Sequence, residues 1–99
     1  MLIVRGVNVF PSEIERIVLK APGVSAHYQL AWEGHASRPD LVVELEESQS
    51  GAVDQRALAS ALRSALGVHL TIRVVDRGQI PRSQGKAVRV INRMIDAMA

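Results

Sequence analysis

The chemically most distinctive stretch of the sequence is residues 80–90, which read IPRSQGKAVRV. We expect a helix over residues 86–98, on which Lys86, Arg89 and Arg93 share the side opposite the apolar stripe. Lys86 would stand at the start of this helix, where a cation opposes the macrodipole by about 0.3–1 kcal/mol. Together with the free N–H groups of the first helical turn, the three cations could hold a phosphate or a carboxylate. A solvated basic face that follows a loop explains the same pattern without any ligand.

Common catalytic and metal-binding motifs are absent from the sequence. A phosphate-binding P-loop requires G-x-x-x-x-G-K-[ST], but Ile80 occupies its first glycine position and Ala87 its last position. The three histidines, His27, His35 and His69, lack the spacing of metal ligands. Cysteine does not occur, which excludes disulfides, thiol catalysis and cysteine-based zinc sites. We therefore expect no metal site and no cofactor held by this chain alone.

Charge is distributed unevenly along the sequence. Residues 1–51 carry four basic and seven acidic side chains, a net charge of −3, whereas residues 52–99 carry eight basic and three acidic side chains, a net charge of +5. The C-terminal half is therefore the half suited to bind an anionic partner. Nucleic acid would be contacted by Arg82, Lys86, Arg89 and Arg93. However, the sequence has only three aromatic residues and lacks the basic–aromatic octamer of RNA-recognition sheets, so we expect no nucleic-acid partner.

The length of 99 residues and the hydrophobic content of 47% indicate a single domain over residues 1–99, with a core that needs no disulfide or metal ion. The longest stretch without a charged residue, Ala21–Trp32, is too short to cross a bilayer. The N-terminus lacks the basic and apolar segments of a signal peptide. We expect a soluble, cytoplasmic domain without a membrane partner, too small to be a complete ATP-dependent enzyme.

Apolar periodicity predicts the order of helices and strands. Residues 11–20 and 53–66 carry apolar side chains at helical spacing, with Pro11 suited to a first helical turn and Gly67 to a C-terminal stop. The predicted strands are residues 1–4, 27–33, 41–46 and 68–75. The order β-α-β-β-α-β, followed by helix 86–98, predicts an α+β, ferredoxin-like sandwich with an added C-terminal helix.

Alternation along the strands assigns side chains to faces. Those expected to face the core are Tyr28, Leu30, Trp32, Leu41, Val43, Leu45, Val68, Leu70, Ile72 and Val74. Those expected to face outward from the second central strand are Val42, Glu44 and Glu46. Before the first helix, Gly6 and Asn8 tolerate positive φ and predict a turn or a bulge.

Two segments also carry motifs that resemble those of a known family. Residues 1–15, MLIVRGVNVFPSEIE, resemble the segment that follows the hinge in adenylate-forming (AMP-binding) enzymes, within the phenylacetate–coenzyme A ligase branch. Residues 80–90 resemble the terminal lysine motif of the same branch. Both motifs belong to the family's small C-terminal domain, so the resemblance covers essentially the whole chain. It implies a mobile lid that rotates between acyl-adenylate formation from a carboxylate and ATP and acyl transfer to coenzyme A.

The resemblance also implies roles for individual residues. Lys86 matches the catalytic lysine that enters the active site for adenylation, where its charge would neutralise the carboxylate and the α-phosphate oxygens. Gly6 matches the loop that lines the pantetheine tunnel of coenzyme A in the second conformation, with Val7 and Asn8 as its neighbours. The further basic residues that would face phosphate are Arg82, Arg89 and Arg93.

The family's large N-terminal adenylation domain is absent from these 99 residues. The resemblance implies that the full enzyme uses ATP, coenzyme A and Mg²⁺, bound mainly by that domain, which would be the covalent or separate partner of this chain. We therefore expect the chain alone to be inactive. The family's hinge aspartate would stand just before Met1, while Gln84 replaces a more usual acid and Val88 a more usual polar residue.

An alternative of a different class is a stand-alone ferredoxin-like module that binds a small ligand or dimerises, without catalysis. Such sandwiches often pair through a sheet edge or a helix face, so a homo-oligomer is compatible with the predicted fold. Saturable binding of an acyl-coenzyme A or an amino acid by the isolated chain would favour this alternative over the ligase domain.

Overall fold

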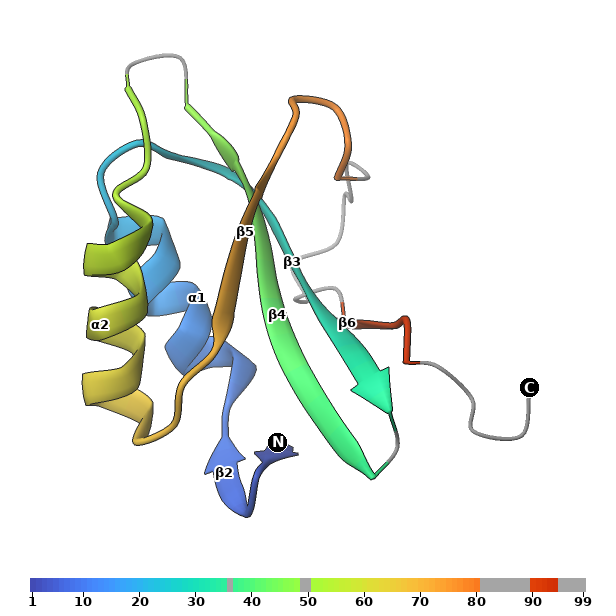
Figure 1. The fold of residues 1–99 in the computed structure, drawn as a ribbon. Coiled ribbons are helices and arrows are strands. Elements are labelled where there is room, and N and C mark those ends of the chain that lie inside the picture. The colour runs from blue at the N-terminus through green and yellow to red at the C-terminus, as the bar shows by residue number, and fades with distance from the viewer. Residues whose placement is uncertain (36, 49–50, 81–89, 95–99) are drawn as a thin grey trace.

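The computed structural model describes residues 1–35, 37–48, 51–80 and 90–94 of the chain. The elements are, in chain order, β1 (Leu2–Val4), β2 (Val7–Val9), α1 (Pro11–Lys20), β3 (Val24–His35), β4 (Arg38–Glu47), α2 (Gln55–Leu66), β5 (Thr71–Val75) and β6 (Val90–Asn92). The two helices lie together on one side of the sheet formed by β3, β4 and β5, and β6 extends this sheet beyond β3 (Figure 1). The core lies between the helix layer and the sheet.

The main sheet has four strands in the order β5-β4-β3-β6. β3 and β4 form a long antiparallel hairpin, in which Tyr28 lies opposite Leu45 and Trp32 lies opposite Leu41. β5 runs parallel to β4, and β6 runs parallel to β3. The central hairpin therefore has one parallel neighbour on each side, and each neighbour comes from the C-terminal half of the chain.

Both helices have the local signals that start and stop them. Pro11 occupies the beginning of α1, where its missing N–H removes no helical hydrogen bond. The Asp54 carboxylate caps α2 by accepting a hydrogen bond from the Ala57 N–H at 3.0 Å. Gly67 ends α2 with φ +80°, and its N–H donates to the Arg63 carbonyl at 2.8 Å. The helix ends predicted at Pro11 and Gly67 are therefore confirmed.

The core is formed by the apolar faces of both helices and the helix-facing side of the sheet. Its fully or nearly fully buried residues are Val4, Val9, Ile14, Val18, Leu30, Leu41, Val43, Leu45, Val53, Leu58, Leu62, Leu66, Val68 and Leu70. Tyr28 and Trp32 pack against this cluster as partly buried side chains. The faces predicted from alternation are thus confirmed on the central strands.

The opposite face of the main sheet, which we call the outer face, is also buried at its centre. Val42, Glu44 and Glu46 point away from the helices, as predicted, yet their exposed fractions are only 2%, 3% and 1%. Gln29 and Ala31 on β3 are similarly buried. Polar side chains on this face need hydrogen-bond partners, because an unpaired polar group away from water is destabilising.

The α+β class, with two helices and a sheet, is confirmed, but the predicted C-terminal helix is wrong over residues 90–92. These residues form β6 and pair with Leu30–Trp32 of β3. The first two side chains of β6 are β-branched, which favours extended backbone when a strand is available for pairing. Residues 93 and 94 are not helical either, and residues 86–89 and 95–98 of the predicted helix lie outside the described residues.

The first predicted strand also differs from its expected place. β1 pairs with β2 in a separate two-stranded sheet instead of joining the main sheet. The reason is local: the chain reverses at residues 5 and 6, so the strand pairs with its immediate successor. In the main sheet, the position beside β3 is taken by β6.

The close approach of two connections at Gly23 is testable by substitution. Gly23 has φ +84°, and a Cβ added there would lie 2.4 Å from the Ala52 carbonyl oxygen. We expect Gly23→Ala to lower the free energy of unfolding by more than about 1 kcal/mol, because the backbone conformation and the contact both oppose a side chain. Gly51→Ala is the control, with an expected change below about 0.5 kcal/mol, because a Cβ at Gly51 would have no neighbour within 4 Å. Urea denaturation measures both, and equal effects would contradict the close approach.

Candidate functional site

The loop that contains Gly6 is a two-residue turn between β1 and β2. Val4 pairs with Val7, and the residues between them, Arg5 and Gly6, have φ +47° and +80°. Positive φ at both central positions is typical of a type I′ turn, whose twist matches that of the flanking strands. The turn predicted near Gly6 is therefore confirmed, whereas Asn8 lies within strand β2.

The surface in front of Gly6 is open. A Cβ added at Gly6 would have no atom within 4 Å, so the glycine is required for its positive φ and not for lack of space. Gly6 and Asn8 are exposed, whereas Val7 packs against the core. The hairpin and its flanks also expose large apolar side chains, those of Met1, Ile3 and Phe10.

The Arg5 side chain ties this turn to the main sheet. Its Nη2 donates to Asp40 Oδ1 at 2.9 Å, and its Nη1 donates to the His69 carbonyl oxygen at 2.8 Å. The other carboxylate oxygen of Asp40 accepts a hydrogen bond from the Thr71 hydroxyl at 2.8 Å. We call these four residues the Arg5 latch. The latch joins the turn to β4, to the start of β5 and to the backbone just before β5.

A second polar group, the ion-pair cluster, consists of Glu33, Glu44, Arg73 and Arg93 on the outer face. Arg73 lies between the two carboxylates: its Nη1 is 3.0 Å from Glu44 Oε2, and both of its terminal nitrogens donate to Glu33. Arg93 donates to the same Glu44 oxygen and lies 3.6 Å from Glu33 Oε2. Gln29 donates to the other Glu44 oxygen at 2.8 Å. The Glu44 side chain, which is 4% exposed, is therefore bonded at both oxygens.

These contacts keep the acids of the ion-pair cluster ionised. Burial alone would raise the pKa of Glu44, but hydrogen bonds from Arg93, Gln29 and Arg73 outweigh burial and hold this pKa below its usual range. Hydrogen bonds from Arg73 lower the pKa of Glu33 as well. Hydrogen bonds to the carboxylates raise the pKa of both arginines. Two acids and two bases thus carry full, mutually compensating charges at neutral pH.

The Arg5 latch and the ion-pair cluster share one row of acidic side chains along β4. Asp40, Glu44 and Glu46 are separated by even numbers of residues and therefore project from the same side of the strand. Glu33 lies opposite Asp40 in the register of β3 and β4, which makes the latch and the cluster neighbours. We call Asp40, Glu44 and Glu46 the acidic row.

Each acid of the row holds a segment next to a predicted site residue. Through the latch, the row holds the turn that contains Gly6. Glu46 accepts a hydrogen bond from the Ile80 N–H at 3.2 Å, immediately before the segment that contains Lys86. The ion-pair cluster holds Arg93, which follows that segment. A single strand thus provides the attachment points on both sides of the predicted lysine motif and at the turn.

The predicted site residues are distributed over different parts of the chain. Those outside the described residues are Lys86, Arg82 and Arg89. Gly6, Val7 and Asn8 share the β1–β2 hairpin. Arg93 was expected to face phosphate, but its charge is compensated within the ion-pair cluster, directly after β6 and apart from the hairpin that contains Gly6. Arg5 and the acidic row were not predicted as functional residues, although the even spacing of the acids in the sequence places them on one side of a strand.

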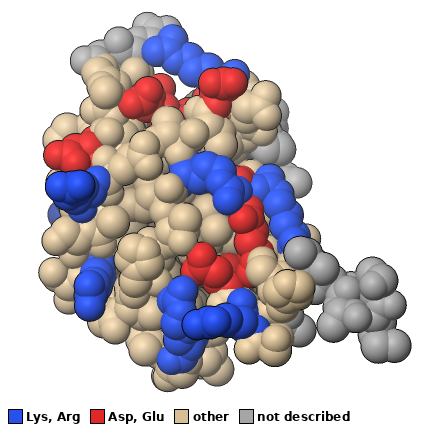
Figure 2. Space-filling view, in the orientation of Figure 1, with Lys and Arg blue, Asp and Glu red and all other residues tan. Residues whose placement is uncertain are grey.

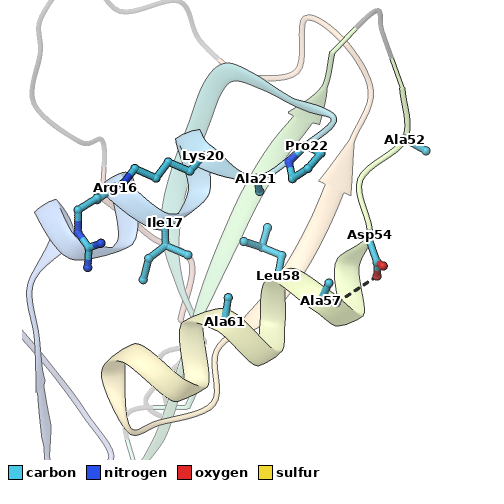
Figure 3. Close-up of a pocket in the computed structure, with 10 residues that line it drawn as sticks. All are labelled: Arg16, Ile17, Lys20, Ala21, Pro22, Ala52, Asp54, Ala57, Leu58 and Ala61. Carbon is cyan, nitrogen blue, oxygen red and sulfur yellow. Dashed lines mark hydrogen bonds between the residues drawn. The ribbon is translucent and has the colours of Figure 1, made fainter.

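A groove of about 460 Å³ lies between α1 and α2 (Figure 3). Ile17 and Leu58 point into it from the two helices, and Arg16 and Lys20 line it from α1. At its other end, the carboxylate of Asp54 is engaged in capping α2. The groove belongs to the helix layer, and none of the predicted site residues that the structure describes lines it.

Lys and Arg side chains of the described residues are interspersed with Asp and Glu side chains on the face shown in Figure 2. Arg73 and Arg93, from the basic half of the chain, pair with acids from the acidic half. The described residues include no group of three or more His, Cys, Asp or Glu side chains arranged to hold a metal ion. Within the same ranges, no helix has the length and apolar character needed to cross a membrane.

The chain matches a known protein family. Residues 6–94 match the family described as the AMP-binding enzyme C-terminal domain. The chain belongs to this family. This AMP-binding enzyme C-terminal domain is 41% identical over 100 residues to the phenylacetate-coenzyme A ligase of Escherichia coli. It is 34% identical over 103 residues to the phenylacetate-coenzyme A ligase of Pseudomonas putida. These alignments cover 93% and 96% of the chain, but only 23% and 24% of the two relatives.

Solved structures show the same fold. A domain of phenylacetate-coenzyme A ligase from Bacteroides vulgatus matches with a TM-score of 0.79 and 29% identity, over 96% of this chain and 93% of that one. The 2-hydroxyisobutyryl-CoA ligase in its postadenylation state, in complex with R3-HIB-AMP, matches with a TM-score of 0.77 and 26% identity, over 93% of this chain and 21% of that one. The resemblance found in the sequence, to the AMP-binding C-terminal domain of phenylacetate–coenzyme A ligases, is therefore confirmed.

The ion-pair cluster predicts a specific dependence of stability on pH. Because folding lowers the pKa of Glu33 and Glu44, the stability that they contribute is present above their unfolded pKa of about 4.3 and is lost as the pH falls through the lower folded values. We expect Glu44→Gln to lower the free energy of unfolding at pH 7 by about 1–3 kcal/mol and to flatten its fall below pH 5. Urea denaturation between pH 3 and pH 7 measures both quantities.

The control is Asp76→Asn, since Asp76 is exposed and its carboxylate has no partner among the described residues. This variant should change the stability at pH 7 by less than about 0.5 kcal/mol. An unchanged pH profile in Glu44→Gln would show that the cluster does not stabilise the fold in this way.

Proposed function

We propose that the chain is the mobile C-terminal domain of an ATP-dependent, AMP-forming phenylacetate–coenzyme A ligase. The observation that carries this proposal is the 41% identity to the Escherichia coli phenylacetate-coenzyme A ligase over 93% of the chain. In this function, the domain presents one surface to the active site during adenylation of the carboxylate and another during acyl transfer to coenzyme A. The assignment of phenylacetate as the substrate rests on the similarity to the relatives, because no described residue of this chain defines an acyl pocket.

The Gly6 turn fits a role in the second half-reaction. The pantetheine arm of coenzyme A is a thin chain that needs a narrow passage between two surfaces. Gly6 is exposed, has open space in front of it and adds no side chain, and Val7 and Asn8 belong to the same hairpin. We infer that this turn forms one wall of the passage, while Met1, Ile3 and Phe10 offer apolar surface for contact with the large domain.

Lys86 is the proposed catalytic residue of the first half-reaction, adenylation of the carboxylate. Its ammonium group would neutralise the substrate carboxylate and the α-phosphate oxygens as they approach each other, a positioning and electrostatic contribution. Arg82 and Arg89 would add positive charge near the same phosphate, whereas Arg93 is committed to the ion-pair cluster. This division assigns the two half-reactions to two separate segments of the chain.

The remaining components belong to the N-terminal adenylation domain, which is the proposed covalent or separate partner. On this proposal, Mg²⁺, ATP and coenzyme A are bound mainly by that domain. This chain spans 23% of the length of the Escherichia coli relative. On this proposal, the chain contributes to catalysis only in the assembled ligase and is inactive alone.

Substitution of the proposed catalytic lysine tests the first role. In the assembled ligase, we expect Lys86→Ala to slow acyl-adenylate formation by about 100-fold or more, because the charge that offsets the approaching oxygens is lost. Acyl transfer from preformed acyl-adenylate to coenzyme A should stay within about twofold of the unsubstituted rate. Pyrophosphate release measures the first step, and thioester formation measures the second.

The control for loss of positive charge is Arg56→Ala, because Arg56 is an exposed residue of α2. It should leave both half-reactions unchanged. Equal losses of both half-reactions in Lys86→Ala would refute the proposed role of the lysine.

Substitution of Gly6 tests the second role. We expect Gly6→Trp to slow thioester formation from preformed acyl-adenylate by about tenfold or more, because the indole would fill the open space in front of the turn. Adenylation should be affected much less. Gly78→Trp is the matched control, since Gly78 has φ +88° and similarly open surroundings but lies outside the hairpin. If Gly6→Trp slowed adenylation as strongly as thioester formation, the tunnel role would be wrong.

A further inference from the structure

Arg5 occupies a backbone position that does not favour arginine. It is the first central residue of the type I′ turn, with φ +47°, and it is the single non-glycine residue with positive φ in the described ranges. Such turns favour Asn, Asp or Gly at this position, because other side chains crowd the backbone there. The turn conformation does not explain an arginine at this position, so the explanation must lie in the contacts of its side chain.

The contacts of the side chain supply this explanation. Both terminal nitrogens of Arg5 are engaged, one by Asp40 and one by the His69 carbonyl. Asp40 is itself oriented by Thr71, which bonds its second oxygen. The planar guanidinium thus bridges two fixed acceptors, a geometry that lysine cannot reproduce. Among the described residues, no other side-chain hydrogen bond joins the tip of the hairpin to the main sheet.

The exposure of the latch indicates what it does. The Arg5 side chain is 46% exposed and the Asp40 side chain 32% exposed, and ion pairs this accessible to water add little to global stability. Their geometric effect is local, because the residue that follows Arg5 is Gly6, whose orientation is set by the same turn. Arg5 thus occupies an unfavourable backbone position, and its side chain contributes little to stability. We therefore infer that the side chain serves to orient the turn.

We propose that Arg5 and Asp40 are positioning residues for acyl transfer, which fix the Gly6 turn in the orientation that receives the pantetheine arm of coenzyme A. This inference rests on the proposed function. Arg5 acts through Gly6 and does not touch the thiol or the acyl group. Asp40 acts one step further away by holding Arg5, and Thr71 orients Asp40.

The key variant is Arg5→Asn, because asparagine suits the type I′ turn but cannot reach the acceptors of the latch. In the assembled ligase, we expect this variant to raise the KM for coenzyme A or slow thioester formation by about tenfold, while adenylation stays within about twofold. Asp40→Ala should have the same selective effect. The double variant should be no worse than either single variant, because both remove the same interaction.

Two further variants serve as controls. Arg38→Asn removes an exposed arginine two residues before Asp40 and should leave thioester formation unchanged. Arg5→Lys keeps the charge but loses the guanidinium fork, so it should restore only part of the rate. Full activity of Arg5→Lys would mean that charge alone suffices and that the latch geometry is unnecessary.

Other results would overturn the inference in distinguishable ways. If Arg5→Asn were impaired and Asp40→Ala were normal, Arg5 would contact coenzyme A directly and would not be a positioning residue. If both variants slowed adenylation and thioester formation equally, the latch would be purely structural. If Gly6→Trp were selective while the latch variants were normal, only this inference would fail. If Gly6→Trp itself were not selective, the proposed function of the turn would fail.

Discussion

Carboxylates on a buried sheet face require cations or N–H donors within hydrogen-bond reach, and Glu44 and Glu46 of the acidic row on β4 impose this requirement on segments distant in the sequence. Glu44 meets it with Arg73 from β5 and Arg93 beside β6, so the same acid attaches the strands on both sides of the central hairpin. Glu46 meets it with the backbone N–H of Ile80, the first residue of the lysine motif. Asp40, at the more exposed end of the row, bonds to the turn of a separate hairpin.

The energetic meaning of the ion-pair cluster lies more in register than in stability. Replacement of buried ion pairs by apolar side chains is often neutral for the free energy of folding, because removing charges from water is unfavourable. However, Arg73 and Arg93 reach Glu44 only when β5 and β6 hold their observed registers beside β4 and β3. An apolar face would tolerate a shift of a strand far better. The cluster therefore fixes the register of β5 and β6. These two strands lie on either side of the segment that carries Lys86 in the sequence, so the cluster also positions both ends of that segment.

The elements that were predicted correctly are those whose signals are local. Proline at the start of α1, glycine at the end of α2 and alternation along β3 and β4 each act within a few residues. The alternation placed Glu44 and Glu46 on the correct side but could not show that this side is buried, since burial depends on segments distant in sequence. For β6, apolar spacing was compatible with a helix, and pairing with β3 decided the outcome. Arg5 was missed because arginine is an unusual residue for a type I′ turn, and only its distant acceptors explain it.

The sequence separations within the ion-pair cluster have a consequence for biosynthesis. Arg73 follows Glu44 by 29 residues and Glu33 by 40, and Arg93 follows Glu44 by 49. A ribosome therefore synthesises both acids before either arginine, and during that interval Glu44 has the Gln29 amide of the same hairpin as a donor but neither arginine. The ion-pair cluster can be complete only after Arg93 has been synthesised. Truncation of the nascent chain before Arg93 would leave a domain in which Glu44 keeps Gln29 and Arg73 as donors but lacks Arg93.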